Sequence, residues 1–317
     1  MGRAHRNGAA ALIGACLALA AASQAVAQAQ PEPLIKSGQT KPVSDHVFVI
    51  LDDNVSFVPN VGIVTGRRGT LIIDTGLGER NGRIVLDEAR KVAASSQFYV
   101  TATHFHPEHD LGATAFPPDA KMLRWVDQQR EADEAGPQTI TRFAGFSPVL
   151  ADLLKGARFR APDIVFDDAI TIDLGGVHVR AFGVGPNHTR GDTAFFVVED
   201  RVLFTGDTVM SVFPAVNAQS ADLGRWLENL DTYEALAPVQ IVPAHGRMGD
   251  LALVRRYRQY LSTVTTRVQA ARAHGATLAA TRAALANDLA EEFADLKPSG
   301  GAPTGRINAA IEAAFRD

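Results

Sequence analysis

The feature that most constrains the fold of this chain is residues 104–110, which read His-Phe-His-Pro-Glu-His-Asp. Three of the nine histidines of the chain and Glu108 lie within six residues. Neutral imidazoles are the commonest protein metal ligands and gain little from burial, so packing alone does not explain this density. The fold therefore has to bring this segment to a pocket, and the pattern predicts a site for more than one metal ion.

The segment follows a predicted β-strand. Residues 98–103, Phe-Tyr-Val-Thr-Ala-Thr, are rich in β-branched and aromatic side chains. If residues 103–106 continue this strand in extended form, His104 and His106 project to the same side, because alternate residues of a strand share a face. These two side chains could then bind one metal ion.

Pro107 suits the first position of a helix, which would place Glu108 and His109 in its opening turn and direct them at a second ion. Four protein groups seldom complete two metal sites, so further ligands are expected from other strand ends. Three candidates lie beside glycines that permit tight turns, namely His188, Asp207 and His245.

With these residues in this order, the chain resembles the metallo-β-lactamase superfamily over roughly residues 45–260. The landmarks are Asp74-Thr75-Gly76, the 104–110 segment, His188, Gly206-Asp207 and His245-Gly246. The resemblance implies an α+β fold, an αββα sandwich of two mixed β-sheets flanked by helices. In this fold the metal ions lie at one edge, between the sheets.

The resemblance also implies a role for each residue. One ion would be held by His104, His106 and His188. The other would be held by His109 and His245. Asp207 matches the bridging carboxylate of the glyoxalase II-like members, and Asp74 would steady the loops that carry the ligands. Glu108 stands where the family's motif has an aspartate that ligates the second ion and orients the attacking hydroxide.

The implied activity is that of a zinc-dependent hydrolase with two ions. Metal-bound hydroxide would attack the carbonyl of a small-molecule substrate, with Glu108 and Asp207 as the catalytic carboxylates. A B3-like β-lactamase fits, since that subclass also lacks a ligating cysteine and is exported. A lactonase or thioesterase of the same fold remains open. Two further alternatives are an iron-dependent sulfur dioxygenase and a non-catalytic metal-binding protein.

The N-terminus predicts export. A short basic stretch precedes the apolar residues 9–22, and Ala25-Val26-Ala27 follows. This layout is typical of a secretory signal peptide over residues 1–27, cleaved after Ala27, and it predicts a periplasmic or secreted protein. The alternative is a lipoprotein with its lipid on Cys16.

Composition excludes several classes of function. Cys16 is the only cysteine, so cleavage after Ala27 would leave neither disulfides nor thiolate ligands. Cleavage removes two arginines and no acid, which takes the net charge from −4 to −6. No basic footprint for nucleic acid is present, and no later segment is apolar enough to span a membrane. The expected partner is a small molecule, and the oligomeric state is left open.

The rest of the chain has the length of one large domain. We interpret residues 28–44, which are rich in proline, as an extended linker, and residues 45–317 as a single domain. This domain contains a helical insertion at about 125–156, interrupted at Gly136-Pro137 and Ser147-Pro148, and C-terminal helices at about 250–317.

Overall fold

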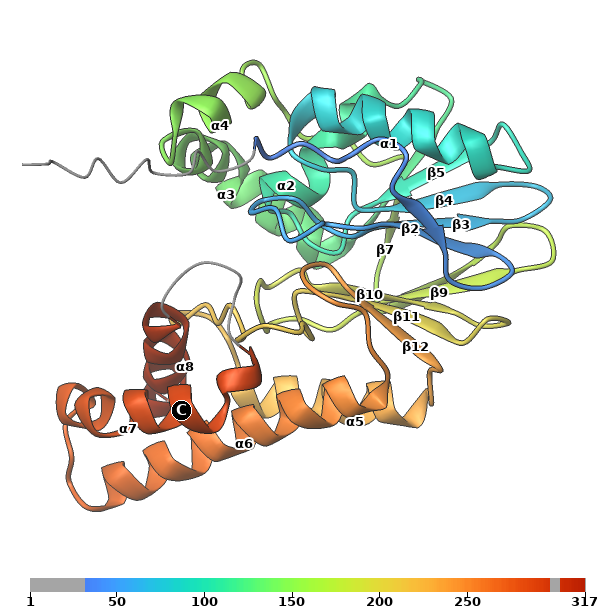
Figure 1. Cartoon of the computed structure of the whole chain (residues 1–317). Coiled ribbons are helices and arrows are strands. Elements are labelled where there is room, and N and C mark those ends of the chain that lie inside the picture. The colour runs from blue at the N-terminus through green and yellow to red at the C-terminus, as the bar shows by residue number, and fades with distance from the viewer. Residues whose placement is uncertain (1–31, 297–302, 317) are drawn as a thin grey trace, which may run out of the picture. The chain divides into compact units, whose positions relative to one another are not determined.

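Two β-sheets form the centre of the protein (Figure 1). The structure is a computed structural model that describes residues 32–296 and 303–316. The seven-stranded sheet has its strands in chain order: β1 (Thr40–Pro42), β2 (Val47–Ile50), β3 (Val61–Thr65), β4 (Thr70–Ile73), β5 (Phe98–Thr101), β6 (Lys121–Trp125) and β7 (Ile164–Phe166). The five-stranded sheet has the order β12 (Gln240–Pro243), β11 (Val202–Gly206), β10 (Thr193–Val197), β9 (His178–Gly183) and β8 (Ala169–Asp173).

Both sheets are mixed. Strands β1 to β4 pair antiparallel, whereas β4, β5, β6 and β7 pair parallel. In the second sheet β8 to β11 are antiparallel, and β11 pairs parallel with β12. Every residue of β3, β4, β10 and β11 is buried, which matches their continuous runs of β-branched and apolar side chains.

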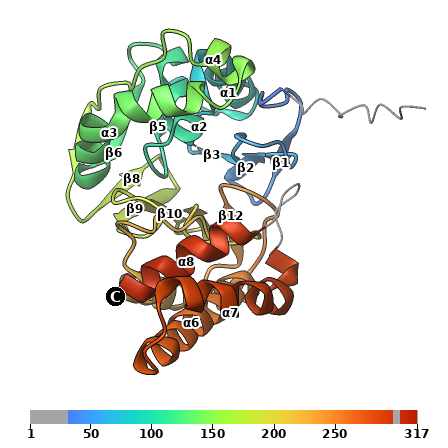
Figure 2. The same ribbon diagram turned by 90° about the vertical axis from the view of Figure 1, so that its left-hand side faces the viewer.

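Helices cover the outer face of each sheet (Figure 2). Those beside the seven-stranded sheet are α1 (Gly78–Val92), α2 (Pro107–Asp110), α3 (Val126–Ala144) and α4 (Pro148–Leu153). Those beside the five-stranded sheet are α5 (Leu223–Ala235), α6 (Leu251–Ala273), α7 (Leu278–Glu292) and α8 (Thr304–Arg316). Two short 3-10 helices are η1 (Leu111–Ala115) and η2 (Ala294–Leu296). The layers confirm the predicted αββα sandwich.

The hydrophobic core lies in three layers. Between the sheets, Leu71 of one sheet packs in the same cluster as Val179 and Phe195 of the other. The outer face of the seven-stranded sheet packs on α1, and the outer face of the five-stranded sheet packs on α5 to α8. Each fully buried side chain of this kind contributes roughly 1.5–3 kcal/mol. The central layer therefore holds the two sheets together and fixes where their strand ends meet.

The structure differs from the predicted linker at residues 28–44. Residues 28–31 lie outside the described part, but Thr40–Pro42 forms β1 and pairs with β2. Ile35 is buried, and its backbone N–H donates to Asn81 Oδ1 at 2.7 Å. A proline is tolerated in β1 because β1 is an edge strand, and the N–H groups along its outer edge have no neighbouring strand to bond. This segment is therefore part of the domain.

The predicted helical insertion also differs in detail. Trp125 ends strand β6, and α3 runs without a break through Gly136-Pro137. A Cβ atom at Gly136 would lie 2.6 Å from the ring of Phe159, so the glycine allows close packing and does not end the helix. The break at Ser147 is present, where its Oγ caps α4 by accepting a hydrogen bond from Leu150 N–H at 3.2 Å.

The region predicted as C-terminal helices contains α6, α7 and α8. In the described ranges 32–296 and 303–316, no helix combines the length and the apolar character that crossing a bilayer requires. The predicted signal peptide and Cys16 lie outside these ranges.

Candidate metal centre

Four strand ends deliver the candidate ligands to one place. Strand β5 leads into the loop of His104, and the loop between β9 and β10 carries His188. Asp207 directly follows β11, and His245 follows β12 by one residue. Gly206 has a φ of +56°, and a Cβ atom there would lie 2.7 Å from Thr103 Cβ. Only glycine allows β11 to bring Asp207 this close to the histidine loop.

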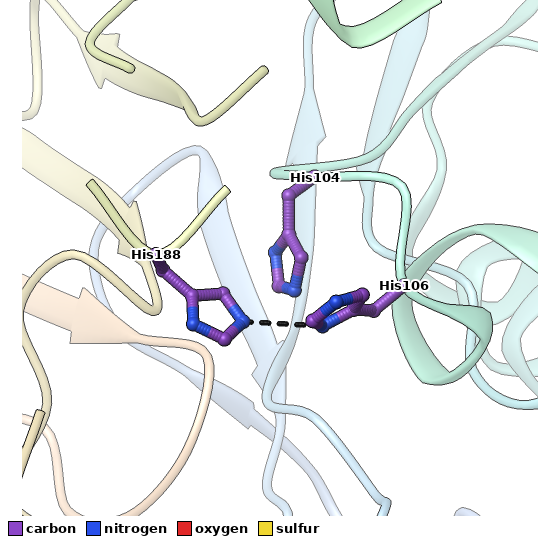
Figure 3. A group of neighbouring side chains, drawn as sticks. All are labelled: His104, His106 and His188. Atoms are coloured by element: carbon purple, nitrogen blue, oxygen red, sulfur yellow. Dashed lines mark hydrogen bonds between the residues drawn. The ribbon is translucent and has the colours of Figure 1, made fainter. Parts of the chain in front are cut away.

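The first group of ligands consists of His104, His106 and His188, whose rings point toward one another (Figure 3). Their candidate ligand nitrogens lie within 4.8 Å of one another. His188 Nε2 is 3.1 Å from His106 Nδ1. Burial, together with the neighbouring histidines, lowers the pKa of both His104 and His106 well below the usual range. These imidazoles are therefore neutral and can donate an electron pair to a cation.

The backbone around this group is not the extended strand that the alternation of residues predicted. Strand β5 ends at Thr101, and residues 103–106 form a bend. Pro107 begins α2, as predicted, and His106 is the residue that precedes the helix. The bend, together with the helix start, directs His104 and His106 at a common point, where a continued strand would have carried them apart along its axis.

The second group of ligands consists of Glu108, His109 and His245, whose ligand atoms also lie within 4.8 Å of one another. Glu108 Oε1 is 3.9 Å from His109 Nε2. The extra methylene of glutamate, compared with the aspartate of the family motif, thus leaves the carboxylate beside both histidines. Burial raises the pKa of Glu108, against the opposing effect of His109 and His245.

Asp207 lies between the two groups. Its Oδ2 is 3.6 Å from His188 Nε2, and its Oδ1 is 3.8 Å from His245 Nε2. One of its carboxylate oxygens also lies within 4.8 Å of the candidate ligand nitrogens of His104 and His109. Burial alone would raise the pKa of Asp207, but His245, His188 and His109 outweigh it and lower the pKa below its usual range. An ionised carboxylate between two histidine groups can bridge two cations.

Four buried atoms at this centre have no hydrogen-bond partner among the described residues. They are His104 Nε2, Glu108 Oε2, His109 Nε2 and Asp207 Oδ1. Most buried polar atoms in proteins are paired, so a cluster of unpaired acceptors needs an explanation. Imidazole nitrogen and carboxylate oxygen are the donor atoms that divalent zinc and iron accept. The residues present therefore fit a metal centre.

In three of the candidate ligand histidines, the ring nitrogen that points away from the centre has a hydrogen-bond partner. Each Nδ1 contacts one oxygen: His109 contacts Asp74 at 2.9 Å, His188 contacts Ala215 O at 2.5 Å, and His245 contacts Val58 O at 3.0 Å. Such partners fix the tautomer and the orientation of a ligating imidazole. With Nδ1 directed at these oxygens, the Nε2 atom of each of the three rings faces the shared centre.

Two further pairs position the ligand loops and had no signal in the sequence. Asp110 accepts two hydrogen bonds from Arg124 Nη2, at 2.8 and 2.9 Å, and both side chains are fully buried. The side-chain amide of Asn60 donates to Pro243 O at 2.9 Å and to Gly246 O at 2.8 Å. Arg124 anchors α2, and Asn60 anchors the turn of His245. Neither partner is recognisable without knowing which segments are neighbours.

A cavity of about 360 Å³ opens onto these ligands. Its polar lining includes His106, Glu108, His188, Asp207 and His245. Its apolar wall consists of Val55, Phe57, Phe143, Val212 and Ala215. A second hollow of about 600 Å³ shares His106, His188, Ala215 and Arg306 with the first. A small organic molecule can therefore reach the ligands along an apolar surface.

Two packed sheets, with helices outside and a histidine and carboxylate centre at the strand ends, define the class of metal-dependent hydrolases. Residues 56–245 match the family model described as the metallo-beta-lactamase superfamily. This match covers more than half of the chain and includes every candidate ligand. The chain belongs to the metallo-β-lactamase superfamily, as the order of its landmarks indicated.

Curated relatives have different activities. The chain is 27% identical to an atrochrysone carboxyl ACP thioesterase of Emericella nidulans, over 74% of this chain and 70% of the relative. It is 25% identical to a linear primary-alkylsulfatase of Pseudomonas sp., over 58% and 41%. It is 27% identical to the human acyl-coenzyme A thioesterase MBLAC2, over 47% and 58%. The chain thus spans about half the length of the latter two proteins.

Solved structures share the fold. The inverting sec-alkylsulfatase from Pseudomonas sp. superimposes with a TM-score of 0.66 at 16% identity, over 86% of this chain and 49% of that chain. The metallo-β-lactamase from Pontibacter korlensis gives a TM-score of 0.55 at 18% identity, over 69% and 96%. At such identities these similarities establish the architecture alone.

Proposed function

We propose that this protein is a zinc-dependent hydrolase with two metal sites that cleaves a thioester or ester. The observation that carries the proposal is the set of four buried ligand atoms that have no partner among the described residues, two of which belong to Glu108 and Asp207 in the lining of the 360 Å³ cavity. Hydrolysis is the chemistry of the superfamily to which the chain belongs. The thioesterase relatives, one of which is matched over 74% of this chain, support a carbonyl substrate.

The two groups of ligands divide between two ions. His104, His106 and His188 would hold one, and Glu108, His109 and His245 would hold the other. Asp207 lies between the groups and would contact both. A bound divalent ion supplies a lowered pKa for water and polarises a substrate oxygen.

Residues of the chain can position the attacking water and the acyl group of the substrate. Glu108 lines the cavity, and its Oε2 has no partner among the described residues, so this oxygen can accept a hydrogen bond from an attacking water and orient it. The apolar wall formed by Phe57 and Phe143 can hold an acyl group and exclude bulk water from the carbonyl. The same wall would accept a β-lactam or a lactone, which remain alternative substrates.

A second candidate is the hydrolysis of a sulfate ester. The observation that favours it is the sequence similarity to the linear primary-alkylsulfatase of Pseudomonas sp., which is 25% identical over 58% of this chain. This reaction consumes water and releases an alcohol and sulfate, and no acyl group is transferred to water.

The experiment is a metal analysis combined with a substrate panel on residues 28–317, purified without chelators. The panel contains an octanoyl thioester, 4-nitrophenyl pentanoate, a lactone, a chromogenic cephalosporin and octyl sulfate. We expect two zinc ions per chain and thioester or ester hydrolysis that is lost with a chelator and restored by zinc. Turnover of octyl sulfate alone would establish the second candidate.

Two outcomes would contradict hydrolysis. Bound iron with oxygen uptake on a persulfide would indicate the sulfur dioxygenase, and stable metal binding without any turnover would indicate a binding protein.

Export is a separate proposal. Sequencing the N-terminus of protein recovered from the periplasm should begin at Gln28, whereas a lipid-modified Cys16 at the N-terminus would show the lipoprotein form.

A further inference from the structure

The C-terminal helix α8 reaches the metal centre. Arg306, in the first turn of α8, lines both the 360 Å³ cavity and the 600 Å³ hollow. It shares this position with His106 and His188, two of the candidate ligands. Arg306 lies outside residues 56–245, the part that matches the family model.

The guanidinium of Arg306 is held in place. Its Nη1 donates to Phe213 O at 2.6 Å. The next residue, Ile307, is fully buried, and so is Ile311 one turn later, in the cluster that also contains residues of α6 and α7. An arginine whose helix is packed on one side and whose head is hydrogen-bonded loses little further freedom when a ligand binds.

Arg306 has no acidic partner in the part of the chain that the structure describes. No carboxylate oxygen of residues 32–296 and 303–316 lies within 4.0 Å of its guanidinium. Arg190, by contrast, forms ion pairs with Glu134 at 2.5 Å and with Glu131 at 3.8 Å. A half-buried cation normally has a counter-charge. An anionic group of a ligand can reach Arg306 through the cavity that it lines.

The other charges of the hollow leave it positive. Arg142 of α3 lines the hollow across from α8 and is exposed. Glu131 is the acid of this lining, but it already accepts a hydrogen bond from Gly191 N–H at 3.0 Å and faces Arg190. The net charge of the whole chain is −4, so a pair of guanidinium groups beside the candidate ligands is not a general surface property.

We propose that Arg306 is a specificity-determining residue that binds an oxyanion of the substrate, such as a carboxylate, sulfate or phosphate group. The guanidinium fork matches such groups with two parallel hydrogen bonds. The apolar part of the substrate would lie on Phe57 and Phe143, which line the 360 Å³ cavity together with Arg306. The substrate class is thus an anionic ester or thioester, and this assignment of substrate rests on the hydrolase function proposed above.

The test compares two esters of equal chain length, mono-4-nitrophenyl glutarate, which is anionic, and 4-nitrophenyl pentanoate, which is neutral. In Arg306→Gln we expect KM for the glutarate ester to rise about 10- to 100-fold, with kcat little changed and both constants for the pentanoate ester preserved. The KM of Arg306→Lys for the glutarate ester should lie between the values of the wild type and Arg306→Gln. The matched control is Arg225→Gln, an exposed arginine of α5 that pairs with Glu228 and lines neither hollow, and this variant should change neither substrate. An equal effect of Arg306→Gln on both esters, or no effect, would overturn the proposal.

A binding measurement separates this proposal from the hydrolase function. Calorimetry with glutarate, inorganic sulfate and inorganic phosphate on the zinc-loaded protein should show at least one anion bound about 10-fold more weakly by Arg306→Gln. The preferred anion identifies the oxyanion class. If the wild type cleaves neither ester, hydrolysis fails while this comparison still decides the role of Arg306. Equal anion affinities would reject that role, and Arg306→Lys replaces the glutamine variant if the latter does not fold.

Discussion

Asp74 Oδ2 accepts a hydrogen bond from His109 Nδ1 at 2.9 Å, and both side chains are buried. The same carboxylate accepts the backbone N–H of Thr103 at 2.7 Å and its hydroxyl at 3.1 Å. Burial alone would lower the pKa of His109, but Asp74 outweighs it and raises this pKa to about 9 in the absence of a metal. One residue at the end of β4 therefore holds both the ring of His109 and the loop that leads to His104.

Replacing Asp74 by asparagine should weaken metal binding about 10- to 100-fold, because the variant loses the charge that orients His109. Asparagine tolerates the φ of +65° at this position, so the backbone is kept. Competition with a chromophoric chelator measures the affinity. Asp87→Asn, on the exposed face of α1, is the control. Unchanged affinity would mean that Asp74 serves only the turn.

Glu108→Gln should reduce the zinc content from two ions toward one. The amide is a poorer ligand than the carboxylate, while the group of His104, His106 and His188 stays intact. Glu108→Asp should retain both ions, because the family motif has aspartate there. Mass spectrometry of acid-digested protein measures the stoichiometry, with the exposed Glu134→Gln as control. Two ions in the glutamine variant would exclude Glu108 as a ligand.

Arg124→Met should lower the free energy of unfolding by about 3–5 kcal/mol, because Asp110 would be left as a buried carboxylate without a counter-charge. The double variant Asp110→Leu with Arg124→Met should recover much of this loss, since it removes both charges. Urea unfolding at fixed pH measures both. Arg130→Met, from an exposed ion pair with Asp127, should cost less than about 1 kcal/mol. A similar small loss for Arg124→Met would contradict the role of the buried pair.

Glu88 should make stability depend on acid pH. Burial alone would raise the pKa of Glu88, but hydrogen bonds from Lys91, Thr40, Gly38 and Ser37 outweigh it and lower the pKa to about 2. A carboxyl whose pKa is lower in the folded state stabilises the fold above its unfolded pKa of about 4.3, and this contribution is lost as the pH falls toward 2.

The corresponding variant is Glu88→Gln, which should lose on the order of 2 kcal/mol near neutral pH. The difference from the wild type in urea unfolding should shrink as the pH falls below about 4.3. The neighbouring Asp87→Asn, on the exposed face of α1, should show no such change. A constant difference across this pH range would show that the hydrogen bonds contribute independently of the charge.

Much of the fold was predictable because its signals are local. The β-branched and aromatic residues of 98–103 predicted strand β5, and Pro107 predicted the start of α2. Two local signals misled. The prolines before His46 suggested a linker, but Pro42 lies in an edge strand, which tolerates it. Gly136-Pro137 suggested a break, but it lies inside a continuous helix. In both places packing against distant residues outweighed the local preference of the chain.

The sequence by itself determined the kinds of ligand and their order along the chain, because ligand chemistry belongs to single side chains and a strand end can be recognised locally. Tertiary structure alone decided that Glu108 reaches His245, that Asp207 lies between the histidine groups, and that α8 places Arg306 at the cavity. Such distances depend on how two sheets and their outer helices pack, and they join residues as far apart in the sequence as Phe57 and Arg306. No local pattern encodes contacts of that range.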